Sequence, residues 1–214
     1  MHTQTPIAGP QPALTAATLR QAIAELCAAD DDLAALAARH GTPPLWARPP
    51  GFATLVLIIL EQQVSLASAR AAFDRLTAAT DPLTPDRLLQ LDDAALKRIG
   101  FSRQKAGYAR DLAQAILDER FDPAALAGLP DDAARRALLQ RKGIGHWTAD
   151  VYLLMALGRP DVWPAGDLAL QVAAQEVKGL PARPTLDELT ALAEGWRPWR
   201  SVAARLLWQH YLHR

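Results

Sequence analysis

Helix-forming residues dominate this chain, and no segment alternates apolar with polar residues over the length of a strand. Half of its 214 residues are hydrophobic, and alanine and leucine prevail among them. Both residue types favour helices, whereas a half-exposed strand would show a period of two. The sequence therefore predicts an all-α fold, with enough apolar residues for one large domain or for two helical lobes.

Capping residues mark where these helices begin. Ser65, Asp92 and Ser102 stand at expected N-caps, and Thr84 precedes a proline that suits a first helical turn. The segment 42–51 contains four prolines, so we expect a non-helical linker there. The helices expected from caps and apolar spacing are 14–28, 31–39, 52–61, 65–78, 85–90, 93–99, 103–119, 131–140, 146–157, 168–177, 186–194 and 198–212.

Composition excludes several classes of protein. The single cysteine, Cys27, rules out an internal disulfide and a four-cysteine metal or iron–sulfur cluster. The longest apolar run, 55–60, is far too short to cross a bilayer, so we expect no membrane association and an intracellular, cytoplasmic location. Residues 1–13 contain three prolines and a glycine, which predicts a flexible leader. His210 and His213 are three residues apart, but two ligands do not make a zinc site.

Basic residues are clustered although the formal net charge is zero. The stretches 97–110 and 135–142 each carry several Lys or Arg residues and no acidic residue, and only basic charges follow Glu194. Any one of these runs would suit a solvated helix face. Because they flank one glycine turn, we interpret them together as a surface that binds phosphates.

That turn lies between two expected helices and reads Lys-Gly-Ile-Gly-His over residues 142–146. A turn built on Gly143 and Gly145 around the apolar Ile144 would point the amides of the next helix, which opens at His146, toward a phosphate. A Gly-x-Gly sequence alone is more often a plain turn. Asp167 follows this region, after the turn 163–166, and an isolated Asp in such a place is usually an N-cap.

Five ordered segments raise the specificity of this pattern: 57–65, 100–106, 142–150, 161–168 and 196–201. In them the chain resembles the helix-hairpin-helix superfamily of DNA glycosylases, in the compact form of its alkylated-base (3-methyladenine type II) branch. The resemblance implies two helical lobes with a cleft between them. The first would combine 14–51 with 160–214, and the second, a helical barrel over 52–159, would carry the hairpin.

The resemblance also implies a mechanism. Asp167 takes the position of the catalytic carboxylate, which would stabilise positive charge on the sugar. A base alkylated at a ring nitrogen is already cationic, so no second acid is needed to expel it. Trp147 and Trp208 take base-pocket positions, where they would bind the cation by cation–π contacts, although core packing is an equal alternative for Trp147. Bifunctional relatives carry a lysine at the Trp147 position, so we expect an enzyme that leaves an abasic site uncleaved.

DNA contacts are implied in the same way. Gln62 and Gln63 would approach the gap left by the flipped base, although a polar helix end explains them equally well. The main-chain carbonyls of Leu139, Arg141 and Gly143 would hold Na⁺ or K⁺ against a phosphate, and we expect no other cofactor. The full set of expected DNA-binding residues is Gln62, Gln63, Ser102, Arg103, Lys105, Lys142, Gly143, Ile144, Gly145, His146 and Thr148.

We therefore expect a monomeric, nucleoid-associated enzyme of base excision repair that acts on double-stranded DNA containing alkylated bases. Two alternatives remain at this point. One is a DNA-binding module that has kept the hairpin without catalysis, and the other is a glycosylase for mismatched or deaminated bases. Neutral leaving groups would make the second reaction harder with a single carboxylate.

Overall fold

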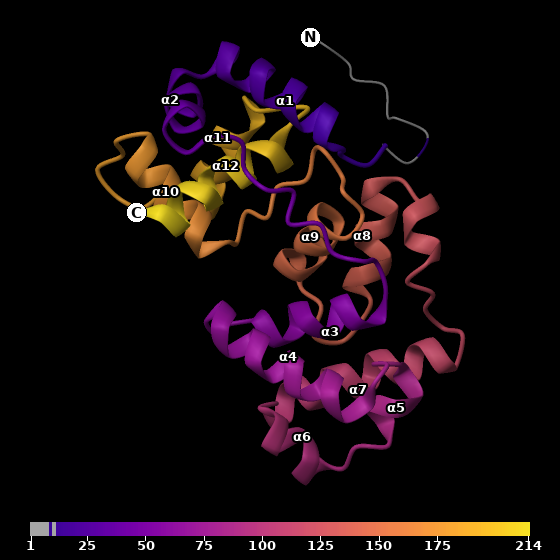
Figure 1. Cartoon of the computed structure of the whole chain (residues 1–214). Helices are drawn as coiled ribbons and strands as arrows, with labels where there is room; N and C mark the ends of the chain where they lie inside the picture. Colours follow the sequence, from indigo (N-terminus) through magenta and orange to yellow (C-terminus); the bar gives the residue numbers. More distant parts are fainter. Residues whose placement is uncertain (1–8, 10–11) are drawn as a thin grey trace. The chain divides into compact units, whose positions relative to one another are not determined.

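The computed structural model describes residue 9 and residues 12–214. Over these residues the chain forms twelve α-helices and one short 3-10 helix, and no strand (Figure 1). The all-α prediction is confirmed. Every expected helix is present, and each observed boundary lies within two residues of the expected one. Most of the expected leader, 1–13, falls outside the described residues.

The chain divides into two compact units. Of the described residues, unit 1 contains Arg48–Tyr152, and unit 2 combines 12–47 with Leu153–Arg214. The N-terminal helices therefore pack with the C-terminal ones, while the middle of the chain forms a unit of its own. One boundary between the units falls inside the helix His146–Met155. The residues of this helix from Leu153 onward belong to unit 2.

Unit 1 is built around a central apolar helix. The helix α3 buries seven of its ten residues, which is the pattern of a helix covered on most sides. It packs against α4 and α7, and α7 also contacts α5 and α6. The elements are α3 (Phe52–Glu61), α4 (Leu66–Thr80), α5 (Pro85–Leu89), α6 (Asp93–Ile99), α7 (Arg103–Leu117), the 3-10 helix η1 (Ala125–Gly128), α8 (Asp131–Leu139) and α9 (His146–Met155).

Unit 2 is built around the last helix of the chain. Nine consecutive residues of α12, from Ser201 to Gln209, are buried. This helix packs against α1, α2 and α10, and α1 packs against α2. The elements are α1 (Ala16–Ala29), α2 (Asp31–His40), α10 (Leu168–Val177), α11 (Leu186–Glu194) and α12 (Arg200–His213).

Most helix starts have the caps that the sequence predicted. The side chains of Ser65, Asp92 and Ser102 accept hydrogen bonds from backbone amides in the first turns of α4, α6 and α7. Thr84 makes no such bond, and the helix after it begins with the expected proline. Among the described residues, no helix is long and apolar enough to cross a membrane, and no group of three or more potential ligand side chains could hold a metal ion.

Histidines from two helices meet in unit 2. His40, at the end of α2, lies 3.3 Å from His210 of α12 between Nε2 and Nδ1, and its ring stacks on that of His213. The other ring nitrogen of His210 lies 3.1 Å from a carboxylate oxygen of Glu176 on α10. Burial, followed by the positive charges of Arg39 and of the two other histidines, lowers the pKa of His40 below its usual value near 6.5.

This lowered pKa predicts a loss of stability in acid. As the pH falls below about 6.5, the unfolded chain takes up the proton on His40 before the folded protein does, so the free energy of unfolding decreases until the folded-state pKa is passed. We expect His40→Gln to flatten this part of the pH dependence. Urea unfolding at pH 7.5 and 5.5 measures it, with His146→Gln as control. An unchanged pH slope in His40→Gln would contradict the prediction.

Candidate active site and nucleic-acid interface

Asp167 is the N-cap of α10, and it also contacts a tryptophan. Its Oδ1 accepts a hydrogen bond from the backbone amide of Leu170 at 3.0 Å and another from the indole Nε1 of Trp208 at 3.2 Å. The two donors fix the rotation of the carboxylate. Capping therefore accounts for one bond to Asp167, and the second joins it to Trp208, which the family resemblance had placed in the base pocket.

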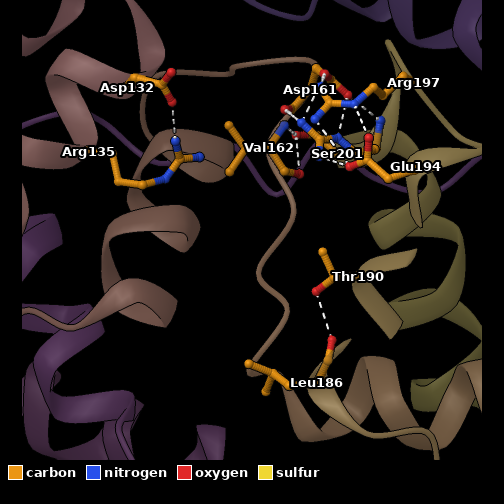
Figure 2. Close-up of polar contacts among 10 residues, drawn as sticks. Asp132, Arg135, Asp161, Val162, Leu186, Thr190, Glu194, Arg197 and Ser201 are labelled. Atoms are coloured by element: carbon orange, nitrogen blue, oxygen red, sulfur yellow. Dashed lines mark hydrogen bonds and ion pairs between the residues drawn. The ribbon is translucent and has the colours of Figure 1, made fainter. Parts of the chain in front are cut away.

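The segment that leads to Asp167 is tied to the start of α12. The carboxylate of Asp161 accepts from Arg197 at 2.7 Å and from Arg200 at 2.8 Å. The backbone N–H of Val162 donates to the Ser201 hydroxyl at 2.9 Å, and this hydroxyl donates back to the Val162 carbonyl at 3.0 Å. Figure 2 shows Arg197 beside Asp161 and Ser201 beside Val162. The helix α12 also carries Trp208. These bonds therefore hold the segment that leads to Asp167 close to the helix that carries the Trp208 indole.

In unit 1, the turn between α8 and α9 depends on one of its two glycines. Gly143 has φ +80°, a conformation that L side chains rarely adopt, and a Cβ placed on it would lie 2.1 Å from the ring of Tyr108. Gly145 has no positive φ, and a Cβ there would meet nothing within 4 Å. Between them Ile144 is buried, and its amide donates to the carbonyl of Arg141 at 3.1 Å.

Two expected DNA-binding side chains, Gln62 and Lys105, instead connect parts of unit 1. The amide Nε2 of Gln62 donates to the Gly143 carbonyl at 2.9 Å and to the Thr148 hydroxyl at 3.0 Å. The Lys105 ammonium donates to the carbonyls of Leu60 and Gln62, each at 2.7 Å, and burial lowers its pKa. Both side chains therefore hold the end of α3 in place, against the hairpin turn and against α7.

Thr148 is a correction to the sequence-based set. Its side chain is 2% exposed and is turned toward Gln62, so it cannot reach a DNA strand at the surface. Position in the sequence did not reveal this, since Thr148 lies in the first turn of α9 together with the exposed His146. Its role is to accept the hydrogen bond that fixes Gln62.

Gln63 differs from Gln62 in exposure and in backbone conformation. It is exposed and has φ +57°, which is uncommon for a residue with a side chain. The next residue, Val64, is 47% exposed although it is apolar. The loop between α3 and α4 therefore presents Gln63 and Val64 to solvent. The hydrogen bonds of Gln62 attach this loop to the hairpin.

Several basic residues that the sequence suggested were unopposed have acidic partners in the fold. Asp93 pairs with Arg110, Asp132 and Asp150 pair with Arg135, and Asp161 pairs with Arg197. Figure 2 shows Asp132 beside Arg135. The expectation of three uncompensated basic runs is therefore wrong for these arginines, because their partners lie elsewhere in the chain. The expected DNA-binding side chains that remain exposed, besides Gln63, are Ser102, Arg103, Lys142 and His146.

Trp147 lies in unit 1, at the second position of α9, and is half-buried. Trp208 lies in unit 2 and is buried except for 8% of its surface. The sequence singled out Trp208 only through the resemblance, because nothing in its local pattern distinguishes it from a core residue. The bond from its indole to Asp167 is the structural reason to place it at the site.

Comparisons with known proteins agree on one family. A family model described as the HhH-GPD superfamily base excision DNA repair protein matches residues 56–198. The structure of a Schizosaccharomyces pombe 3-methyladenine DNA glycosylase (Mag1) in complex with abasic DNA superimposes with a TM-score of 0.82. The two are 26% identical, and the match covers 88% of this chain and 95% of that one.

Two further proteins are similar. A DNA-3-methyladenine glycosidase from Bacillus halodurans superimposes with a TM-score of 0.75 at 30% identity, over 89% of this chain and 88% of the other. The S. pombe alkylbase DNA glycosidase-like protein mag2 is 31% identical over 59% of this chain. The chain spans 60% of the length of mag2, and 64% and 40% of the lengths of curated relatives from Bacillus subtilis and Mycobacterium tuberculosis.

Proposed function

We propose that this chain, which belongs to the HhH-GPD superfamily of base excision DNA repair proteins, is a monofunctional DNA glycosylase that excises alkylated purines from double-stranded DNA. The observation that carries the proposal is the Asp167 carboxylate, oriented by a backbone amide and by the indole of Trp208. The names of the two similar solved structures, both 3-methyladenine enzymes, support this choice of substrate.

The chemistry requires only one carboxylate. Cleavage of the glycosidic bond leaves positive charge on the sugar, which the negative charge of Asp167 would stabilise. The electron pair of the broken bond goes to the alkylated purine, which is cationic before cleavage and leaves as a neutral molecule. Water then adds to the sugar carbon C1′ and gives up a proton. The product is an abasic site in an intact strand.

Aromatic side chains would bind the base in the flipped state. The indole of Trp208 is held by its bond to Asp167, and we assign its ring to stacking on the cationic purine. Trp147, which is half-buried near the start of α9, keeps its proposed role in base binding. Because an indole has no amine that can attack the sugar, Trp147 supports a reaction without a Schiff base and without strand cleavage.

The hairpin and the loop after α3 would hold the DNA. Lys142, Gly145 and His146 are exposed at the turn, where the first amides of α9 and the lysine can bind a phosphate. We assign Gln63 to the gap left by the flipped base, since it is the exposed glutamine of the pair. Ser102 and Arg103, exposed at the start of α7, would add a second phosphate contact.

We propose that the main-chain carbonyls of Leu139, Arg141 and Gly143 hold a monovalent cation. The Arg141 carbonyl accepts from Ile144, and the Gly143 carbonyl accepts from Gln62. A carbonyl oxygen has two lone pairs, so each of these two keeps one for an ion. When bound, Na⁺ or K⁺ would supply positive charge beside a phosphate, and we propose no part for it in the cleavage itself.

Substitution of Arg103 should change the salt dependence of DNA binding, whereas substitution of Lys105 should not. Arg103→Gln removes an exposed charge near DNA, so we expect the slope of log K against log salt to become about 0.9 less steep. Lys105→Gln should leave this slope unchanged but slow base release, because the loop that carries Gln63 loses its anchor. Fluorescence anisotropy at four salt concentrations measures the slope for each variant, and a single-turnover assay measures its rate of base release. A reduced slope for Lys105→Gln would mean that Lys105 contacts a phosphate directly.

The function itself is tested by incubating the protein with methylated DNA and identifying the released bases by chromatography. We expect 3-methyladenine and 7-methylguanine, and a labelled strand that stays intact until it is treated with alkali. Binding without release of any base would instead support a non-catalytic DNA-binding module. Release of mismatched or deaminated bases alone would support the other alternative.

A further inference from the structure

A tryptophan in the proline-rich segment before unit 1 has a strained backbone. Trp46 has φ +46°, a genuine outlier for a bulky residue. Such strain persists only where the surroundings impose it, and it is concentrated at functional sites. The indole of Trp46 is half-buried, and its centroid lies 6.4 Å from that of Trp208, with the two ring planes at 74°. This is an edge-to-face pair at a favourable distance.

One face of α12 imposes this conformation. Arg205, Trp208 and Gln209 are three and four residues apart, so they share that face. Gln209 donates from Nε2 to the His40 carbonyl at 3.0 Å, and Arg205 donates from Nε to the Leu45 carbonyl at 3.0 Å. The segment 40–45 is thus fixed at both ends, and Trp46 follows directly.

Arg205 is an unusual anchor. Its side chain is 1% exposed, and its other hydrogen bonds also go to main-chain carbonyls, of Ser201 and Leu154, each at 2.9 Å. Burial lowers its pKa to about 10, so it stays charged at neutral pH. Burying a charged group is costly, and here the hydrogen bonds join three separate segments of unit 2. The charged Arg205 side chain thus holds the segment that carries Trp46.

We propose that Trp46 is a specificity-determining residue that packs with Trp208 against the alkylated base, and that Arg205 is its positioning residue. This inference rests on the proposed function. Two indole rings near a right angle give a planar cation one face to stack on and a second electron-rich ring beside it. Asp167 is hydrogen-bonded to one of these rings, so sugar and base would be stabilised by adjoining groups. Residue 46 lies outside the segment 56–198 that defines the family match.

The test compares Trp46→Leu with Trp46→Phe in single-turnover release of 7-methylguanine, which is cationic in DNA, and of hypoxanthine, which is neutral. We expect Trp46→Leu to slow release of the cationic base roughly tenfold, a loss between those of an exposed and a fully desolvated cation–π contact, and to slow that of the neutral base much less. Trp46→Phe should retain most of the rate. The matched control is Trp199→Leu, which removes a half-buried indole that bonds to Glu25 of the same unit.

Arg205→Lys tests the positioning role. Lysine cannot reach all three carbonyls, so we expect a lower preference for the cationic base and no further loss of that preference when Trp46→Leu is added. Additive losses of preference would refute positioning through Trp46. If Arg205→Lys does not fold, the Trp46 variants decide the proposal alone. Wild-type activity with an unchanged preference in Trp46→Leu would overturn it, whereas a wild-type protein that releases no methylated base would overturn the proposed function instead.

Discussion

Asp167→Asn should slow base release by about 10²- to 10³-fold, while DNA affinity and stability change little. Asparagine keeps the acceptor oxygen for the Leu170 amide and the Trp208 indole, and it caps helices as well as aspartate does. Only the negative charge is lost. Single-turnover release from a duplex with one 7-methylguanine measures the rate, and thermal unfolding and binding to abasic DNA measure the rest.

Asp92→Asn is the matched control for this change. Asp92 is an exposed N-cap of α6 that accepts from the Ala95 amide, so the same substitution changes a cap that has no part in the proposed chemistry. We expect its rate of base release to equal that of the wild type. If Asp167→Asn also released the base at the wild-type rate with unchanged binding, Asp167 would not be the catalytic group.

Gly143→Ala should be the most damaging substitution in the hairpin. Alanine at φ +80° costs about 1–2 kcal/mol, and the new Cβ would overlap the ring of Tyr108, which adds about 1–3 kcal/mol. We expect a protein less stable by about 2–5 kcal/mol that binds DNA at least tenfold more weakly, since the turn must move away from Tyr108. Urea unfolding and anisotropy measure the two effects.

Gly145→Ala provides the comparison within the same turn. This residue has no positive φ and open space around its Cα, so the fold should tolerate alanine with a change in unfolding free energy below about 1 kcal/mol. Two glycines that look equivalent in sequence should therefore differ strongly. Equal losses of stability in both variants would contradict the structural account of the turn.

Local features of the chain could be predicted from sequence because they depend on neighbouring residues. Helix starts at Ser65 and Ser102 depend on a side chain and an amide three residues later, and the linker depends on its own prolines. The 3-10 helix η1 was not predicted, because its single turn of Ala-Leu-Ala-Gly has no side-chain cap and is too short for an apolar period.

The candidate site was harder to predict where long-range contacts decide a role. Gln62 and Gln63 are adjacent and identical in type, yet one bonds to a turn about 80 residues away and the other faces solvent. The linker was expected only to connect, yet it holds Trp46 at a positive φ, and the residue before Trp46 is bonded to α12, at the other end of the chain. Arg205 looked like one more basic surface residue until its carbonyl partners were located.

The most direct test of the central claim, that the Asp167 carboxylate stabilises a sugar cation, is binding of duplexes that carry a transition-state mimic. A pyrrolidine in place of the sugar is positively charged, whereas a tetrahydrofuran of the same shape is neutral. We predict that the wild-type protein binds the pyrrolidine duplex at least about 100-fold more tightly than the neutral one, and that Asp167→Asn loses most of this preference. The same preference in both proteins would contradict the claim.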